Sequence, residues 1–307
     1  MLGQELVRVF KYDKDYEISS WDKEEIDITK AKEVEKKLLD LKPNIIINAA
    51  AYTNVDKCED PKEFLLAKKI NGTAPGKLAE IAKKIKAVFV HYSTDYVFGG
   101  SLPEIEEPKG CSGSCGSCGL HAGFMPQIGY NENSKPKPLN KYGKSKLLGE
   151  KNIQKVGGKF YSIRSSKLFG KPGISDGAKK SFFDIMLELG NPPAGGGKSI
   201  KVIDDEISCF TYAPDLARKT KEIIEANKTP GIYHVTNSDS CTWYEAVLEL
   251  YRQAKIKTKV VPVTPEEFPR PAKRASISIL LNTKLNPLRS YKEALKEYLR
   301  SNKTKIK

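Results

Sequence analysis

The first two-thirds of the chain alternates short apolar runs with segments of helical periodicity. The clearest apolar runs are residues 43–51, which end in three alanines, and residues 87–92. Residues 31–41 and 63–84 instead place apolar side chains three and four positions apart, as an amphipathic helix does, with an interruption near residues 71–75. Strands alternating with helices are typical of a parallel sheet covered on both faces. The sequence therefore predicts an α/β fold.

Further elements follow the same pattern towards the carboxyl end of the chain. Strands are predicted at residues 159–163, 200–203, 231–235 and 259–263, and helices at 213–217, 242–252 and 291–300. A strand is also predicted to end at Asp22, whose carboxylate could bond a ribose hydroxyl and would favour NADH. The neighbouring Lys23 could equally accept the phosphate of NADPH, so the sequence leaves the choice of cofactor open.

Residues 1–10 have a helical pattern with no strand before them. A dinucleotide-binding fold normally begins with a strand and a glycine-rich turn, and only then continues into such a helix. Gly3 matches the last glycine of that turn. The interpretation that we favour is a start codon assigned too late, with the strand and the earlier glycines encoded upstream.

The bulk composition excludes several classes of protein. The 307 residues carry a formal net charge of +14, but the lysines are spread through every predicted helix and do not form a stripe with interleaved aromatics. That distribution indicates a basic surface and no nucleic-acid partner. No apolar run approaches the ~20 residues of a membrane span. With no signal-peptide pattern at the amino end, we expect a cytoplasmic protein with no membrane contact.

Tyr142 and Lys146 are the main candidates for chemistry. Four residues apart, they lie on one face of a helix, where the ammonium should lower the pKa of the phenol from its ordinary value near ~10. Thr94 follows the apolar run 87–92 and would add a hydroxyl hydrogen bond to the same substrate oxygen. A proton donor, a charge that tunes it and an orienting hydroxyl suit the reduction of a ketone by hydride transfer.

Other reactive side chains have simpler interpretations. Tyr251 and Lys255 repeat the spacing, but no strand and threonine precede them, so they indicate an ordinary amphipathic helix. His91 and His234 lie within predicted strands and are expected to be structural. The glycine-rich residues 195–198 lack the order of a phosphate-binding P-loop and indicate a surface turn. The isolated cysteines are expected to be buried small side chains, and they are Cys58, Cys209 and Cys241.

Many short motifs occur in an order that carries a resemblance. They are Leu2-Gly3, residues 27–29, 48–53 and 55–57, Ser93-Thr94-Asp95-Tyr96-Val97-Phe98, Tyr142 with Lys146 and Gly149-Glu150, residues 164–170, 204–206, 211–217, 233–235, 243–244 and Arg270-Pro271. With them the chain resembles the dTDP-4-dehydrorhamnose reductase family, a group of extended short-chain dehydrogenases/reductases, over nearly its whole length. The resemblance implies reduction of the C4 ketone of dTDP-4-dehydro-L-rhamnose to dTDP-L-rhamnose, with NADPH or NADH as the cofactor.

The resemblance also implies a domain organisation. It predicts a Rossmann-type doubly wound parallel sheet with a smaller C-terminal substrate domain. The cofactor domain would comprise residues 1–167 and 206–228, and the substrate domain residues 168–205 and 229–307. The expected partners are a dTDP-sugar and, as a homodimer, a second copy of the chain.

Residue roles follow from the same resemblance. The catalytic set would be Thr94, Tyr142 and Lys146. The cofactor would contact Tyr142 and Lys146. It would also contact a further set: Met1, Leu2, Gly3, Asp22, Asp27, Ile28, Ala51, Tyr52, Thr53 and Tyr92. The sugar nucleotide would contact Thr94, Asp95, Tyr96, Lys167 and Arg270. At Lys167 the family commonly has a tryptophan that touches the sugar; a lysine could pair with a diphosphate oxygen or point to solvent.

An insertion at residues 100–130 carries a cysteine-rich segment. Cys111, Cys115, Cys118 and His121 could close a tetrahedral zinc site or hold an iron–sulfur cluster, because a cytosolic chain seldom forms disulfides. The alternative is a glycine-rich flap with reduced thiols, which the close spacing and the absence of paired Cys-x2-Cys knuckles favour.

Two other functions are weighed against the reductase. One is a non-catalytic regulatory or binding subunit, which the incomplete glycine turn suits and the complete set of Thr94, Tyr142 and Lys146 opposes. The other is a related sugar-nucleotide epimerase or dehydratase. Dehydratases usually place acidic residues directly after the strand threonine, whereas here Asp95 is followed by Tyr96.

Overall fold

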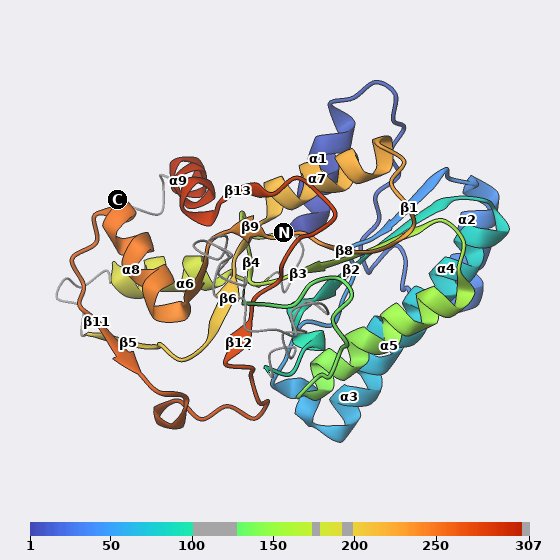
Figure 1. Cartoon of the computed structure of the whole chain (residues 1–307). Helices are drawn as coiled ribbons and strands as arrows, with labels where there is room; N and C mark the ends of the chain where they lie inside the picture. Colours follow the sequence, from blue (N-terminus) through green and yellow to red (C-terminus); the bar gives the residue numbers. More distant parts are fainter. Residues whose placement is uncertain (101–127, 174–178, 192–198, 303–307) are drawn as a thin grey trace, which may run out of the picture.

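A four-stranded parallel sheet, in the order β1-β2-β3-β8, forms the centre of the protein (Figure 1). The structure is a computed structural model that describes residues 1–100, 128–173, 179–191 and 199–302. The strands of the sheet are β1 (Ile45–Asn48), β2 (Val88–Thr94), β3 (Phe160–Ser165) and β8 (Gly231–His234). Each begins within two residues of the start of a strand predicted from an apolar run, so the predicted parallel sheet is confirmed.

Helices cover both faces of this sheet (Figure 1). One face carries α1 (Leu2–Lys11) and α7 (Ala213–Glu225), and the other carries α2 (Ala31–Leu41), α4 (Ala74–Lys84) and α5 (Lys141–Val156). Side chains of a strand alternate between faces, so Val90 and Tyr92 pack with α1 and α7, while Phe89 packs with α2 and α4. His91 shares the face of Phe89 and points towards α5.

The predicted long helix before β2 is continuous instead of interrupted. It consists of α3 (Pro61–Ala67), the π-helical segment η2 (Lys68–Thr73) and α4. Asn71 lies buried in η2, where its amide bonds both the backbone N–H and the carbonyl of Tyr52 at 2.9 Å and the Ser145 hydroxyl at 3.0 Å. The widened turn therefore ties the segment after β1 to α5, and such turns are frequent at functional sites.

Most of the remaining elements form a second apolar core beside the sheet. Its helices are α6 (Phe182–Gly190), α8 (Trp243–Ala254) and α9 (Tyr291–Ser301). The short 3-10 helices are not part of this core: η1 (Lys57–Glu59) and η3 (Asp95–Val97) contact α5, and η4 (Pro265–Glu267) has no buried residue. The strands are β4 (Leu168–Phe169), β5 (Ile200–Ile203), β6 (Ile207–Cys209), β7 (Thr211–Tyr212), β9 (Asn237–Ser238), β10 (Ser240–Thr242), β11 (Val260–Val263), β12 (Ile277–Ser278) and β13 (Leu288–Ser290).

These strands make one sheet in the order β10-β6-β12 and the pairs β11-β5, β13-β9 and β4-β7. The aromatic side chains of Phe183, Phe210 and Tyr298 meet leucines of α6, α8 and α9 in this core. Both α6 and α8 begin with a capping box, in which a hydroxyl and a carboxylate satisfy backbone N–H groups of the first turn. Among the described residues, no helix combines the length and apolar content that crossing a membrane requires.

One predicted strand is wrong. The residues leading to Asp22 form no strand, and Asp22 begins a turn in which its carbonyl accepts from the Ile26 N–H at 3.0 Å. In the described part of the chain, β1 forms an edge of the sheet and has a strand neighbour on one side. The segment before Asp22 pairs with no described strand, and backbone groups on either side of it form turn hydrogen bonds instead of a ladder.

Candidate active site

The first turn of α5 presses against the segment that follows β2. Asn140 caps the helix by accepting a hydrogen bond from the Gly143 N–H at 2.8 Å. A Cβ at Gly143 would overlap the backbone carbonyl of Tyr96, so only glycine allows this approach. The close contact brings Tyr142 to the carboxyl end of β2.

Thr94 and Tyr142 meet at this point. The Tyr142 phenol lies beside the Thr94 side chain, which accepts from the Tyr96 N–H at 3.2 Å and donates its one hydroxyl proton to Asp95 at 2.9 Å. The ring of Tyr96 stands edge-on to that of Tyr142, with centroids 5.5 Å apart. A carbonyl oxygen beside both side chains would meet the Tyr142 hydroxyl as a donor, and the Thr94 hydroxyl once its proton turns away from Asp95.

Lys146 lies one helical turn further on and is 2% exposed. Its Nζ donates to the Tyr92 carbonyl at 2.5 Å and lies 3.4 Å from Nε2 of His91. Burial lowers the pKa of Lys146 to about 8, against the opposing charge of Glu150. The ammonium is thus directed at the backbone of β2.

The predicted lowering of the Tyr142 pKa is wrong for this structure. Burial raises the pKa of Tyr142, and the negative charge of Asp95 raises it further, while the hydrogen bond with Thr94 acts in the opposite direction. The reason is geometric, because the Lys146 ammonium is directed at the Tyr92 carbonyl. In this arrangement the phenol is a firmly protonated donor.

Asp95 is 1% exposed, and its carboxylate is surrounded by hydroxyl donors. Thr94 donates to one oxygen at 2.9 Å, and Ser166 and Ser278 donate to the other at 2.8 Å each. These donors come from the ends of β2 and β3 and from β12. The carboxylate therefore joins the sheet to the second core beneath Thr94.

Lys167 is a half-buried cation held by aromatic rings. Its Nζ lies 4.9 Å from the ring centroid of Tyr96 and 4.5 Å from that of Trp243, and 3.5 Å from the Tyr96 hydroxyl. Burial lowers the pKa of Lys167, but Tyr96, Asp95 and Glu206 outweigh it and the pKa is raised. The backbone is left-handed there, with φ at 41°, which for a lysine is strained and fixes the direction of the side chain.

Two arginines complete this side of the site. Arg270 forms an ion pair with Glu206, which also accepts from the indole N–H of Trp243 at 3.0 Å. Arg274 reaches Asp56 with both terminal nitrogens, at 2.5 and 2.8 Å. A small hollow beside Arg274 is lined by Asp95, Tyr96, Lys167, Arg274 and Ser278, among others.

Residues predicted to contact a cofactor gather at the same edge of the sheet, with exceptions. The first turn of α1 has no side-chain cap, so its amides are available to an anion. Ala51, Tyr52 and Thr53 follow β1, and the Tyr52 hydroxyl bonds Glu63. The Tyr92 side chain instead points away and bonds Thr220 on α7 at 2.8 Å, which leaves its carbonyl facing α5.

Two of the other predicted cofactor contacts, Asp27 and Ile28, already have partners within the chain. The Asp27 carboxylate accepts from the Thr29 N–H at 2.9 Å and from its hydroxyl at 2.8 Å, which closes a turn. Ile28 packs against the core between the sheet and α2. Asp22 is exposed in its own turn.

Tyr251 lies in an ordinary amphipathic helix, α8, as predicted. The Tyr251 hydroxyl bonds the Met186 carbonyl at 2.8 Å, and Lys255 lies beyond α8 in a left-handed cap. Cys58, Cys209 and Cys241 are buried, as predicted. The proposed metal ligands Cys111, Cys115, Cys118 and His121, and the glycine-rich residues 195–198, lie outside the described residues. Within the described ranges, no group of three or more histidine, cysteine and acidic side chains could hold a metal ion.

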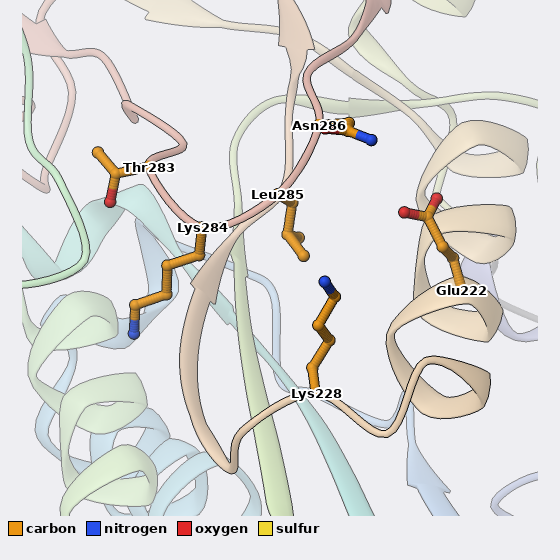
Figure 2. Close-up of a pocket in the computed structure, with 6 residues that line it drawn as sticks. All are labelled: Glu222, Lys228, Thr283, Lys284, Leu285 and Asn286. Atoms are coloured by element: carbon orange, nitrogen blue, oxygen red, sulfur yellow. The ribbon is translucent and has the colours of Figure 1, made fainter.

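A further surface hollow is lined by Glu222, Lys228 and residues 283–286 (Figure 2). It adjoins the start of β8, whereas Thr94 ends β2. Because these strands are parallel, the hollow lies at the amino-terminal ends of the strands, opposite to Thr94. It contains no residue predicted for the site.

The sequence analysis did not identify the buried polar residues that bond side chains near the predicted catalytic set. Asn48 at the end of β1 bonds His91, Asn71 in η2 bonds Ser145, and Ser166 and Ser278 bond Asp95. The available signal was a polar residue at the end of an apolar run or inside an amphipathic helix. The partners are far away in the sequence, so that signal could not identify them.

Comparison with known proteins gives consistent results. The sequence profile of the RmlD substrate binding domain family matches residues 1–304. The spore coat polysaccharide biosynthesis protein SpsK of Bacillus subtilis is 32% identical over 302 residues, which is 97% of this chain and 93% of that protein.

Two solved structures cover nearly the whole chain. The dTDP-4-dehydrorhamnose reductase of Clostridium acetobutylicum has a TM-score of 0.83 at 34% identity and covers 98% of this chain and 96% of its own. That of Bacillus anthracis, in complex with NADP, has a TM-score of 0.81 at 31% identity and covers 97% and 95%. The match to a Rossmann-type reductase fold therefore extends over both cores.

Proposed function

Because the chain belongs to the RmlD substrate binding domain family, we propose that it is an NADPH-dependent sugar-nucleotide reductase that converts dTDP-4-dehydro-L-rhamnose to dTDP-L-rhamnose. Relatives with that activity in their names cover almost the entire chain, and one of them is in complex with NADP. The observation that carries the proposal is the placement of the Tyr142 phenol beside the Thr94 side chain at the carboxyl end of β2. That edge is where open parallel sheets bind their ligands.

The cofactor proposed is a nicotinamide dinucleotide, which supplies a hydride to the carbonyl carbon when bound. What supports its fit is the uncapped first turn of α1, whose amides suit a diphosphate, together with the residues that follow β1 and β2. We infer NADPH in preference to NADH from the NADP bound by the Bacillus anthracis relative.

In the proposed mechanism, Tyr142 donates its phenolic proton to the carbonyl oxygen of the sugar. Thr94, whose one hydroxyl proton is donated to Asp95 in this structure, would turn that proton to the sugar oxygen and so orient it. The phenolate left on Tyr142 takes up a proton from solvent afterwards. Lys146, one helical turn further on in α5, would favour that phenolate whenever the lysine is charged. The raised pKa of Tyr142 is consistent with the phenol being protonated before each turnover.

The sugar nucleotide is proposed to lie between the two cores. Tyr96, Lys167 and Arg270 would face it from the side of the second core, where Lys167 offers a cation to a diphosphate oxygen. Asp95 would support Thr94 from below. The division into a cofactor part, residues 1–167 and 206–228, and a substrate part, residues 168–205 and 229–307, is proposed with it, except that β8 at residues 231–234 belongs to the central sheet of the cofactor part. A homodimer stays a prediction, which analytical ultracentrifugation checks.

The experiment is a coupled assay in which the 4-keto sugar nucleotide is made in place and the reduced product is identified by chromatography and NMR. We expect oxidation of NADPH that depends on the sugar nucleotide and yields the 6-deoxy sugar with a C4 hydroxyl. NADH in place of NADPH should give a lower kcat/KM. Binding of the sugar nucleotide without any turnover, with either cofactor, would overturn the proposal in favour of a binding subunit.

A further inference from the structure

A buried row of polar side chains runs across the sheet beneath Lys146. Asn48 on β1 and His91 on β2 are neighbours in the register of the parallel pair. Both point towards α5, and the exposed fractions of Asn48, His91 and Lys146 are 5%, 1% and 2%. Asn48 and His91 have no part in the proposed mechanism, yet His91 is one of two groups in hydrogen-bond range of the lysine.

The orientation of the Asn48 amide is fixed by the backbone. The Ala50 N–H can only donate, and it donates to Oδ1 of Asn48 at 3.1 Å. The NH2 group of Asn48 therefore faces Nδ1 of His91, 3.2 Å away. An NH2 group also only donates, so Nδ1 of His91 must be an acceptor without a proton.

His91 is held in its neutral form. Burial, and after it the charge of Lys146, lower the pKa of His91 well below its ordinary value. A neutral imidazole carries one proton, and with Nδ1 accepting, that proton is on Nε2. The Nε2–H group points at Nζ of Lys146, 3.4 Å away.

A donor aimed at a lysine has a direct consequence. An ammonium group has no lone pair, so an N–H that faces it is repelled, whereas the neutral amine accepts that N–H as a hydrogen bond. Of the other groups around Lys146, the Tyr92 carbonyl and Glu150 on its own helix favour the charged form. Glu150 is itself paired with Arg164 of β3, Tyr142 is neutral, and η2 contributes the uncharged Asn71 to this part of α5.

We propose that Asn48 and His91 are positioning residues that set the protonation of Lys146: Asn48 fixes the Nε2–H tautomer of His91, and His91 in turn favours the neutral amine. A Lys146 that gains and loses a proton near the working pH could also return a proton towards Tyr142 after each turnover, because proton transfer is most efficient when the pKa lies near that pH. The lowered pKa of Lys146 agrees with this arrangement.

The inference rests on the proposed function only where it gives Lys146 a role in catalysis; the tautomer of His91 and the protonation of Lys146 do not depend on it. Its first test therefore needs no substrate. Nitrogen-15 NMR of the full chain with labelled histidine distinguishes the two neutral tautomers, and the signals of the three histidines are assigned with His91→Leu as a reference. We expect His91 to be neutral from pH 6 to 8, with the proton on Nε2. A proton on Nδ1, or a charged ring, overturns the proposal without any variant having to fold.

The second test inverts the tautomer. Asn48→Asp keeps the shape of the side chain but replaces the donor by an acceptor, so His91 should move its proton to Nδ1 and turn a bare Nε2 to Lys146. The ammonium then gains an acceptor, and we expect its titration midpoint to rise by about one unit or more. NMR of labelled lysine side chains follows it, because other lysines titrate near ~10.4 and Lys146→Met identifies the signal.

A double-mutant cycle separates the tautomer from the added charge. Asn48→Asp is compared in the wild-type chain and in His91→Leu, in both cases by the titration of Lys146 and by the alkaline limb of the pH dependence of kcat. The proposal requires a shift that depends on His91. An equal shift with and without His91 means that the new carboxylate acts directly, and the proposal fails.

The two failures are distinguishable. If the tautomer and the cycle behave as expected but no sugar nucleotide is reduced, the proposed function is wrong and the inference about His91 stands. If turnover is normal but the shift is independent of His91, the reverse holds.

Discussion

Tyr142 is set apart from the other tyrosines by what surrounds it. Its hydroxyl meets Thr94 at the end of a central strand, while Tyr251, with the same spacing to a lysine, bonds a helix carbonyl inside the second core. Identical local patterns therefore have different chemistry because different segments pack against them.

This difference supplies a matched pair of variants. Tyr142→Phe removes the proton donor and keeps the ring, so we expect turnover to fall ~10²–10⁴-fold with little change in stability. Tyr251→Phe removes the corresponding hydroxyl from the other copy and should keep turnover while it lowers the stability by ~1 kcal/mol. Steady-state kinetics and urea unfolding measure both. Similar turnover in the two variants would refute the assignment of Tyr142.

Lys167 gives a second prediction at the same scale. Lys167→Met removes the cation between Tyr96 and Trp243 and keeps an unbranched side chain. If the ammonium binds a charged oxygen, the KM for the sugar nucleotide should rise ~10–100-fold, with a much smaller fall in kcat, since a hydrogen bond to a charged group contributes ~1.5–3 kcal/mol. Lys144→Met, on the exposed side of α5, is the control. Unchanged KM in Lys167→Met would mean that the lysine serves only its two rings.

Among the elements, α5 is fixed to the sheet by a buried ion pair. Glu150 and Arg164 of β3 are each 1% exposed and form two hydrogen bonds, at 2.7 and 2.9 Å. The ring of Phe98 covers the guanidinium, with the ring centroid 5.0 Å away. Since α5 carries Tyr142 and Lys146, this pair holds the catalytic helix in its register on β3.

Breaking the pair should be costly. Glu150→Gln leaves the Arg164 charge buried without a partner, and we expect the free energy of unfolding to fall by ~3–5 kcal/mol. Glu188→Gln breaks the exposed pair with Lys180, whose two side chains are 48% and 53% exposed, and should change it by ~0–1 kcal/mol. Guanidinium unfolding of both variants checks the contrast. An equal loss of unfolding free energy in the two variants would show that the buried pair of Glu150 and Arg164 stabilises the protein no more than an exposed pair does.

At the scale of the whole molecule, Asp56 and Arg274 join distant parts of the chain. Asp56 follows β1, and Arg274 precedes β12 of the second core. The Arg274 guanidinium, by its hydrogen bond, is the largest cause that holds the pKa of Asp56 below its ordinary value. A depressed carboxyl pKa adds stability above the unfolded value of ~3.9, and this contribution is lost as the pH falls through the folded value.

This link has a pH signature. Arg274→Met should lower the stability at pH 7 by ~1 kcal/mol or less, because the Asp56 carboxylate is partly exposed. The difference from the wild type should vanish as the pH falls below the ordinary range of a carboxyl group, where Asp56 is protonated in both proteins. Urea unfolding at a series of pH values measures it. A difference that persists undiminished in acid would assign the effect to the lost packing of the arginine stem.

The sequence by itself determined most elements and the spacing of the residues that we propose to react. Strands such as 43–48 and helices such as 31–41 follow from apolar periodicity, which depends on neighbouring residues alone. The spacing of Tyr142 and Lys146 likewise fixed their common helical face. Only the tertiary structure decided what these groups meet. The lysine turned to the Tyr92 carbonyl and His91, the phenol pKa rose through burial, and the segment before Asp22 formed no strand. Hydrogen-bond partners, burial and strand neighbours come from segments far apart in the chain, and no local pattern records them.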